Sequence, residues 1–303
     1  MITLRFPLLK PIECVATVGV FDGLHLGHLF LIRKLKKIAK RKKLPSLVVT
    51  FWPPPQRILS SSFLGFLTNL EEKKQILARE EVDYLLLFHT TPDLLHLRGE
   101  EFLEKLISSI KVNTLVVGED FRFGYRREIG VKKLKKFSGE MGFDVIVLKK
   151  KKLGKRIISS SYIRRLIKKA SFPQAERLLA RPYIIEGKIV KGKGLGSTIG
   201  YPTLNVDWQN KMIPKRGVYV VKVFLRRRWR LALCNIGFAP TVSRDKKMSM
   251  EIYILHLRKK IKPKKVKIIF LKRIRRERKF PSLEKLKERI DKDIRAVLSK
   301  YSG

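Results

Sequence analysis

The chain contains only two cysteines, Cys14 and Cys234, and both lie in apolar stretches. Two thiols are too few for a disulfide framework or a cysteine metal cage. The sequence also lacks any run of about 18 apolar residues that could cross a membrane, and its start, MITLRFPLLKPIECV, lacks the long apolar core of a signal peptide. We therefore expect a reducing, cytoplasmic location and no membrane partner.

Acidic residues are scarce. The 303 residues include 26 Asp and Glu against 69 Lys and Arg, and the formal net charge is +43. The excess is spread over both halves, because residues 181–303 hold 34 basic and 9 acidic residues and the first 180 hold 35 and 17. Such a charge attracts nucleic acids, anionic lipids and phosphorylated small molecules in general. It indicates partners rather than a fold, and 44% hydrophobic residues suffice for packed cores.

The first half of the chain alternates short apolar runs with segments of helical period. Buried strands are expected over residues 15–21, 46–51, 83–88, 114–118 and 143–148. Helices are expected between them, for example over residues 28–40 and 70–82. Strand–helix–strand order with continuously apolar strands indicates a parallel sheet covered on both faces. We therefore predict a doubly wound, Rossmann-like α/β domain over residues 1–180.

A different pattern begins near Pro182. Runs of β-forming residues, separated by turns with Gly and Pro, continue to about residue 275. Ser282 can then cap a helix that runs to about Lys300. We predict a second domain over residues 181–303, a small β-barrel of about six strands with a closing C-terminal helix, and a pair of helices over residues 161–182 that joins the two parts.

The segment GVFDGLHLGH, residues 19–28, holds two of the five histidines of the chain. It follows an apolar strand, so it lies at the edge of the sheet where such folds bind ligands. Gly23 permits a sharp turn, and Gly27 opens a helix whose first amides suit a phosphate. Ring N–H donors of His25 and His28 on one side would stabilise charge that develops on a phosphoryl group. The alternatives are a zinc site, which needs two further ligands that do not cluster here, and two structural histidines beside a turn.

This segment resembles the signature of the HxGH nucleotidyltransferases. Further motifs follow in the order found in the bacterial bifunctional riboflavin kinase/FMN adenylyltransferases, also called FAD synthetases. VVTFWPPPQRIL resembles their F-x-P-H-P segment, with Pro54 in place of the usual His. VVGEDFRFG at 116–124 matches a segment beside the flavin and nucleotide, and ISSSYIRRLI at 158–167 resembles an S-S-T-x-I-R element that closes over ATP phosphates.

The resemblance implies that this half joins FMN to ATP, forming FAD and pyrophosphate. It implies catalytic roles for His25, His28 and Arg164, and it places Asp120 and Phe123 near the flavin. The ATP-binding residues that it implies in this half are Gly19, Phe21, Asp22, Gly23, Gly27, Ser160 and Ser161. Considered without the resemblance, Asp120 could be a turn carboxylate and Phe123 a core residue.

The segment GKIVKGKGLGSTIGYPTLNV, residues 187–206, resembles the glycine-rich flap and the G-R-x-L-G-F-P-T-A-N motif of riboflavin kinases. The resemblance implies that Gly200, Thr203 and Asn205 bind ATP and that Thr203 and Asn205 hold Mg²⁺. Hydroxyl and amide oxygens are ligands that suit Mg²⁺ bridging phosphates.

Downstream motifs extend the same resemblance. It implies that Glu251, in MEIYIL, is the base that takes a proton from the ribityl 5′-hydroxyl, and that Arg275 lies near the flavin. Three features of this half depart from the family. Ser197 stands where the motif has arginine, Leu195 stands where another basic residue is common, and the basic segment HLRKKIKPKKVKI at 256–268 replaces an acidic turn.

Together these observations predict a bifunctional enzyme that uses ATP and Mg²⁺, converts riboflavin to FMN and FMN to FAD, and is a monomer or a weak homo-oligomer. One alternative is another HxGH transferase with an accessory barrel, although YPTLN and MEIYIL argue against it. The other is a basic nucleic-acid-binding protein. Surfaces that stack bases interleave aromatic and basic residues, whereas the basic runs here contain Trp229 as their one aromatic exception. We therefore expect no specific nucleic-acid partner.

Overall fold

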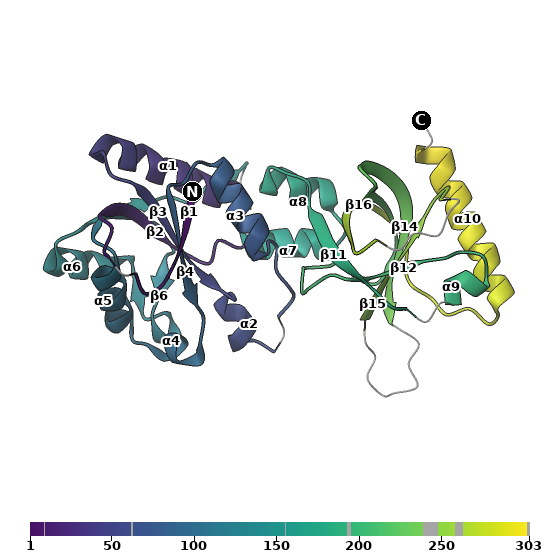
Figure 1. The fold of residues 1–303 in the computed structure, drawn as a ribbon, viewed down its shortest axis with the longest axis horizontal. Helices are drawn as coiled ribbons and strands as arrows, with labels where there is room; N and C mark the ends of the chain where they lie inside the picture. The colour runs from purple at the N-terminus through teal and green to yellow at the C-terminus, as the bar shows by residue number, and fades with distance from the viewer. Residues whose placement is uncertain are drawn as a thin grey trace. The chain divides into compact units, whose positions relative to one another are not determined.

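The computed structural model describes residues 1–8, 10–61, 63–154, 156–192, 195–238, 248–257 and 263–301. The chain forms two compact units, Met1–Ile163 and Arg164–Gly303 (Figure 1). The division falls within the first helix of the predicted pair, and the boundary predicted at residue 180 lies where the second helix ends. No helix among the described residues is both long and apolar enough to cross a lipid bilayer.

The first unit is built on a parallel sheet of six strands. These are β1 (Ile2–Arg5), β2 (Cys14–Val18), β3 (Ser46–Trp52), β4 (Tyr84–His89), β5 (Val112–Gly118) and β8 (Asp144–Leu148). Their order across the sheet is β1-β4-β3-β2-β5-β8, and every neighbouring pair is parallel. All five residues of β2 are buried, as the apolar sequence predicts for a central strand covered on both faces.

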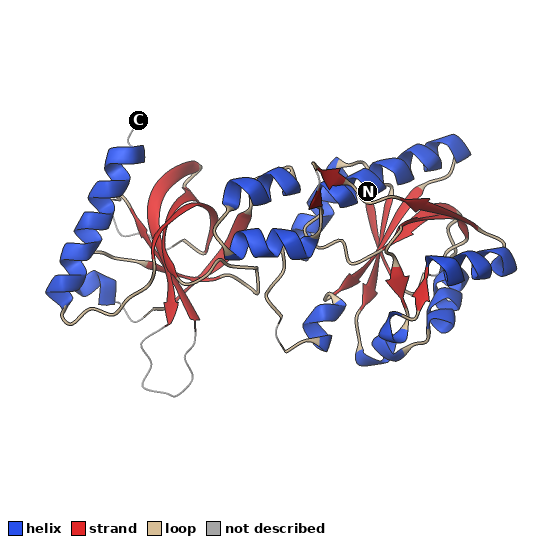
Figure 2. Ribbon diagram, turned by 180° about the vertical axis from the view of Figure 1, so that it is seen from behind, coloured by secondary structure: helices blue, strands red, loops and turns tan. Residues whose placement is uncertain are grey.

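Helices cover both faces of this sheet (Figure 2). The main ones are α1 (Leu26–Lys42), α3 (Leu70–Arg79), α5 (Gly99–Ser109) and α6 (Val131–Met141). Side chains alternate along β2, so Val15 packs with α1 and α3 on one face while Ala16 packs with α5 and α6 on the other. Shorter elements connect them: α2 (Pro55–Leu59), α4 (Pro92–His96), β6 (Arg122–Phe123), η1 (Tyr125–Arg127), β7 (Ile129–Gly130), β9 (Lys152–Leu153) and β10 (Arg156–Ile157).

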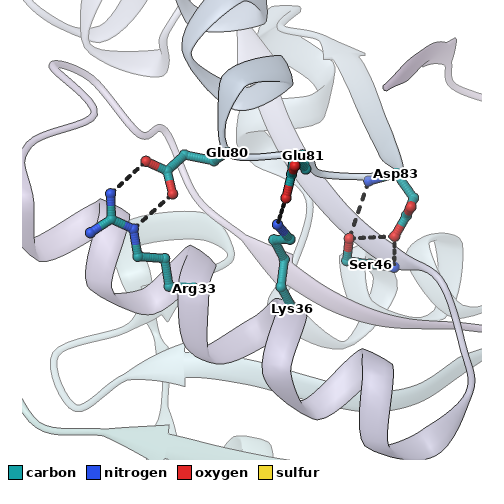
Figure 3. Close-up of polar contacts among 6 residues, drawn as sticks. All are labelled: Arg33, Lys36, Ser46, Glu80, Glu81 and Asp83. Atoms are coloured by element: carbon teal, nitrogen blue, oxygen red, sulfur yellow. Dashed lines mark hydrogen bonds and ion pairs between the residues drawn. The ribbon is translucent and has the colours of Figure 1, made fainter.

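Ion pairs fasten α1 to the segment that follows α3 (Figure 3). The Arg33 guanidinium donates two hydrogen bonds of 2.8 Å to the Glu80 carboxylate, and Lys36 Nζ lies 2.9 Å from a Glu81 carboxylate oxygen. Exposed pairs of this kind contribute at most about 1 kcal/mol each. They join α1, which carries His25 at its N-cap and His28 in its first turn, to the segment after α3.

The second unit is a closed antiparallel barrel. Its strands are β11 (Ile184–Val190), β12 (Leu204–Asp207), β13 (Gly217–Leu225), β14 (Arg228–Phe238), β15 (Met248–Ile254) and β16 (Lys265–Arg275). Their order is β11-β12-β15-β14-β13-β16, and pairing of β11 with β16 closes the barrel. The helices are α7 (Ser160–Lys168), which begins in the first unit, α8 (Phe172–Leu179), α9 (Leu195–Thr198) and α10 (Leu283–Tyr301).

The closing helix α10 packs on the outside of the barrel. Its Val297 joins a buried cluster with Val220 of β13 and Leu233 of β14. Ser282 caps the helix, because its Oγ accepts a hydrogen bond of 3.3 Å from Lys285 N. The predicted doubly wound domain, barrel and closing helix are therefore confirmed.

Candidate functional site

The loop that joins β2 to α1, residues 19–25, lies at the point where the strand order of the sheet reverses. From β2 the chain proceeds to β3 and β4 on one side and returns to β5 on the other. Open α/β sheets bind ligands at the carboxyl ends of their strands at such a point. Gly19 begins the loop, and its amide donates a hydrogen bond of 3.0 Å to Val49 O. A Cβ on Gly19 would lie 3.0 Å from the Phe21 ring, so this ring packs against bare backbone.

The loop turns through an unusual backbone conformation. Phe21, Gly23 and Leu24 have φ values of +46°, +89° and +37°. Glycine adopts such values readily, whereas each of the other two residues costs about 1–2 kcal/mol. Tertiary contacts must therefore hold this conformation.

The Asp22 carboxylate supplies several of those contacts. It is 7% exposed and accepts hydrogen bonds of 3.0 Å each from the amides of Leu67 and Thr68. The Thr68 hydroxyl in turn accepts a hydrogen bond of 3.0 Å from Gly23 N. Asp22 thus connects the loop to the segment just before α3. Its carboxylate, which was predicted to bind ATP, here binds backbone amides of the protein.

Lys73 binds the start of the loop from α3. It is 1% exposed, and its ammonium donates hydrogen bonds to Val20 O at 2.7 Å and to Thr50 Oγ1 at 2.9 Å. Burial lowers the pKa of Lys73 to about 8, and the negative charge of Asp22 opposes that shift. A buried cation therefore lies directly under the strand end from which the loop begins.

His25 is the N-cap of α1. Its Nδ1 accepts hydrogen bonds from the amides of Gly27 at 3.2 Å and His28 at 3.3 Å. The hydrogen of the neutral ring is thereby assigned to Nε2, so Nε2 is the ring atom of His25 that can donate a hydrogen bond. Two of the amides that the sequence predicted to face a phosphate instead donate to this ring. The rings of His25 and His28 stack with centroids 3.7 Å apart, so the predicted pairing of the two histidines is present.

Gly27 leaves room for the ring of His25. A Cβ on Gly27 would lie 3.1 Å from Cε1 of the His25 ring, closer than most real contacts. The Phe21 ring meets His28 edge-on, with centroids 5.3 Å apart. The residues of the HxGH segment therefore fix one another's orientation.

Of the residues predicted in the ISSSYIRRLI segment, Ser160 contacts the loop. Its Oγ donates a hydrogen bond of 2.7 Å to Asp22 O, although the two residues are far apart in the sequence. Ser161 is exposed, and Arg164 is half-buried on α7. Arg164 belongs to the second compact unit, and its catalytic role together with His25 and His28 stays a prediction.

The predicted flavin residues of this half follow β5. Asp120 forms an ion pair of 3.0 Å with Lys150. The Phe123 ring is half-buried, with its centroid 5.3 Å from that of Phe121 and 5.7 Å from that of Phe102. Phe123 thus lies at the edge of the core with part of its surface accessible, which permits both of the roles considered above.

In the barrel, strand register brings predicted kinase residues together. Asn205 of β12 is paired with Glu251 of β15, which is paired on its other side with Asn235 of β14. Burial raises the pKa of the half-buried Glu251 carboxyl. Gly192 lies so close that a Cβ there would be 2.0 Å from Asn205 Nδ2. The flap backbone therefore contacts the proposed metal ligand directly.

Thr203 lies two residues before Asn205, beside α9. A Cβ on Gly196 would be 2.4 Å from Tyr201 O and 3.2 Å from Thr203 Oγ1. The nearby Gly200 has φ +91°. Thr203 and Asn205 offer neutral hard oxygens, and among the described residues no group of three or more His, Cys, Asp or Glu is arranged to hold a metal ion. Such a donor pair fits Mg²⁺, which keeps waters and binds substrate phosphates.

Two acidic residues of α10 reach this part of the barrel. The Tyr201 hydroxyl donates a hydrogen bond to the Asp291 carboxylate. The Arg275 Nε lies 2.8 Å from an oxygen of Asp293, which is 4% exposed and also pairs with Arg289 at 3.0 Å. The closing helix thus holds both the residue that precedes the PTLN segment and the predicted flavin contact Arg275.

Comparison with known proteins matches the two parts of the chain to two family models. The family model for FAD synthetase matches residues 9–162, and the family model for riboflavin kinase matches residues 179–300. A bifunctional riboflavin kinase/FMN adenylyltransferase of Escherichia coli (strain K12) is 35% identical over 92% of this chain and 90% of its own length. The chain belongs to the bifunctional riboflavin kinase/FMN adenylyltransferase family.

A second curated relative and a solved structure are also similar over most of the chain. The Listeria monocytogenes bifunctional riboflavin kinase/FMN adenylyltransferase is 33% identical over 93% of this chain and 90% of its own length. A crystal structure from Streptococcus pneumoniae, described as a macrolide-efflux protein, covers 99% of this chain with a TM-score of 0.82 and 29% identity. The family resemblance drawn from the motifs is confirmed.

Lys73 and Tyr201 are the residues of this site that the sequence reasoning missed. Lys73 occupies an apolar-face position of its helix, three residues after Leu70 and four before Leu77. That spacing is the signal that could have revealed a buried lysine. Tyr201 stands where the family motif usually has Phe, and a hydroxyl added to an apolar position calls for a polar partner.

We predict that Lys73→Met lowers the free energy of unfolding of the first unit by about 1–3 kcal/mol, because Val20 O and Thr50 lose a buried donor and Asp22 loses a nearby cation. Calorimetry measures the shift. Lys74→Met is the matched control, since Lys74 forms a surface ion pair of 2.9 Å with Glu71 and its loss costs a few tenths of a kcal/mol. Equal melting temperatures for the two variants would contradict this role of Lys73.

Proposed function

We propose that the chain catalyses two successive ATP-dependent reactions. The barrel phosphorylates riboflavin to FMN, and the first unit adenylylates FMN to FAD with release of pyrophosphate. The tandem arrangement of the two family matches on one chain carries this proposal. We further propose that the enzyme works with Mg²⁺ in the cytoplasm, as a monomer or a weak homo-oligomer, with domains that meet near residue 180.

In the kinase reaction, the ribityl 5′-hydroxyl oxygen forms a bond to the γ-phosphorus of ATP and the bond to ADP breaks. Glu251 accepts the hydroxyl proton, and burial makes its carboxylate a stronger base than an exposed one. Thr203 and Asn205 hold Mg²⁺, which neutralises phosphate charge when bound. Gly200 lets the flap approach ATP, and Arg275, oriented by Asp293, contacts the flavin.

In the adenylyl transfer, a phosphate oxygen of FMN attacks the α-phosphorus of ATP and pyrophosphate leaves. The His25 Nε2–H, His28 and Arg164 stabilise the charge that develops on the α-phosphoryl oxygens. Ser161 donates to phosphate oxygens, and Ser160 does so when its hydroxyl exchanges its bond to Asp22 O for one to the phosphate. The glycines of the loop allow ATP to approach the backbone. Asp120 and Phe123 bind the flavin.

Chromatography of flavins tests the proposal. The purified chain is incubated with riboflavin, ATP and Mg²⁺, and FMN should appear first and then convert to FAD. Formation of FAD from added FMN with riboflavin untouched would limit the activity to the first unit and would implicate Ser197 in loss of the kinase. The absence of conversion of either flavin would overturn the proposal.

We predict that His28→Ala abolishes FAD formation from FMN and leaves FMN formation from riboflavin unchanged, because the stacked histidines belong to the first unit and the kinase residues to the barrel. Both reactions are followed by chromatography with the same preparation. His96→Ala, which removes an exposed histidine of the first unit, serves as the control and should change neither rate. Equal loss of both reactions in His28→Ala would refute the assignment of two sites.

We predict that Glu251→Gln lowers kcat for riboflavin phosphorylation by about 10²–10⁴-fold while FMN adenylylation persists. In the unmodified protein, kcat/KM of the kinase should fall as pH drops through the raised pKa of Glu251, above the ordinary value of 4.5, because the protonated carboxyl cannot accept the hydroxyl proton. Glu186→Gln, on β11, removes a partly exposed carboxylate and should leave the pH profile unchanged. An acid limb at or below the ordinary value would count against Glu251 as the base.

We predict that Tyr201→Phe raises the KM for ATP of the kinase by up to about tenfold and changes kcat less, because one net hydrogen bond to Asp291 no longer restrains the flap. Steady-state kinetics at saturating riboflavin measures this. Tyr301→Phe, near the end of α10, makes the same chemical change outside the flap and is the control. An unchanged KM would show that the hydroxyl does not position the flap.

A further inference from the structure

The outer face of β13 is only partly covered by the closing helix. Val220 packs under Val297 of α10, whereas Lys222 and Phe224, two and four residues farther along the same face, are exposed. Phe224 is 36% exposed and is paired across the β13–β14 hairpin with Trp229, which is 42% exposed. Their ring centroids lie 5.2 Å apart. The hairpin therefore presents two large aromatic rings side by side to solvent.

Cations surround these rings. Arg226 and Arg227 form the two-residue turn of the hairpin, Arg228 begins β14, and all three are exposed. On the other side, Lys267 of β16 is paired with Phe224. Its Nζ lies 4.0 Å from a Glu186 carboxylate oxygen at the edge of this surface. We refer to Phe224, Arg226, Arg227, Arg228, Trp229 and Lys267 as the basic-aromatic patch.

The backbone of the turn indicates that local folding preference did not select its residues. Arg226 and Arg227 have φ values of +47° and +63°. A two-residue hairpin turn with positive φ at both positions favours Asn and Gly, and an arginine is unfavourable there. Two arginines at such a turn fit a binding role better than a structural one, since less favourable conformations are typical of functional sites.

We propose that the basic-aromatic patch binds single-stranded nucleic acid without sequence specificity. Bases stack on Trp229 and Phe224, while the three arginines and Lys267 contact phosphates, which is the combination that proteins use for single strands. The net charge of +43 attracts the polyanion over longer range, and the patch supplies the point of contact. This binding is separate from the flavin reactions.

The arrangement favours a nucleic acid over a lipid surface. The tip of the hairpin consists of Arg226 and Arg227, and the aromatic rings lie behind it on the strand face. Insertion of the rings into the hydrocarbon region of a bilayer would carry Arg226 and Arg227 into it first, and charged side chains are costly there. A sheet face with two exposed aromatic rings and surrounding cations instead fits a single strand laid across it.

Fluorescence anisotropy of a labelled oligothymidylate, titrated with the full chain at low and moderate salt, tests the proposal. Trp229→Ala should weaken binding by about tenfold and leave the salt dependence unchanged, because it removes stacking only. The double variant Arg226→Asn/Arg227→Gly keeps a favourable hairpin turn. It should weaken binding and reduce the slope of log K against log salt by about 1.4, the value for two phosphate contacts on a single strand.

The double variant Lys132→Ser/Lys133→Ser is the matched control, because it removes the same charge from exposed positions of α6 in the first unit. It should change the affinity by less than about twofold. Formation of FMN and FAD by the same preparations shows that each variant is folded.

Three outcomes would overturn the proposal. One is equal weakening by all the charge variants, which would mean general attraction to a basic chain. Another is unchanged oligothymidylate binding in Trp229→Ala. The third is sedimentation with phosphatidylserine vesicles that depends on Trp229 while oligothymidylate binding does not, which would identify lipid as the partner.

Discussion

Two buried charges hold the loop on which the first site depends. The Asp22 carboxylate binds amides that precede α3, and the Lys73 ammonium, on α3 itself, binds the carbonyl of Val20. Between them the backbone adopts the left-handed conformation at Phe21, which it would not adopt in isolation. Removing either charge leaves the other buried with one fewer compensating contact, which is strongly unfavourable in a protein interior. The cap that His25 places on α1 follows from this loop path, so the position of the histidine pair rests on groups that need not touch a substrate.

In the barrel, too, a few carboxylates hold residues of the predicted site in place. Its half of the chain holds only 9 acidic residues against 34 basic ones, yet Asp291 binds Tyr201 and Asp293 binds Arg275, both in or beside the predicted site. Glu251 lies on the paired strand between two asparagines. Because basic residues are abundant in this half of the chain, the positions of its few carboxylates determine more specifically which side chains are held in place. The closing helix therefore does more than cover the barrel, since it binds two side chains in or beside the predicted kinase site.

Local patterns in the sequence predicted the architecture well, because each depends on neighbouring residues. The apolar runs predicted five of the six parallel strands to within a few residues, and Ser282 marked the start of α10. The edge strand β1 was not predicted, because its four residues are mostly exposed and form no continuous apolar run. Contacts between distant segments could not be predicted in the same way. The bond of Ser160 to Asp22 and that of Tyr201 to Asp291 each join segments far apart in the sequence. The pairing of Phe224 with Trp229 depends on the hairpin register, which the sequence does not reveal. In the sequence alone, the basic run around Trp229 therefore contains a single aromatic residue.

Chemistry within a ring also escaped the sequence. His25 and His28 were predicted to present ring N–H donors on the same side, and spacing alone cannot show that Nδ1 of His25 instead accepts the amide hydrogens that cap the helix. The burial of Lys73 was missed for a different reason, which concerns its surroundings and not its own chemistry. A lysine in an amphipathic helix normally reaches solvent, and only the strand ends packed around it keep this one buried.

The net charge of the chain attracts anions over a longer distance than a hydrogen bond or ion pair spans. Screening confines the attraction between exposed charges to about 8 Å at physiological ionic strength, so the basic surface concentrates phosphorylated ligands without choosing where they bind. Choice requires local geometry. On β14, Trp229 and Asn235 are six residues apart, about 20 Å along the strand. A polynucleotide laid on the basic-aromatic patch would therefore lie at one end of the barrel strand and leave Glu251, at the other, open to ATP and riboflavin.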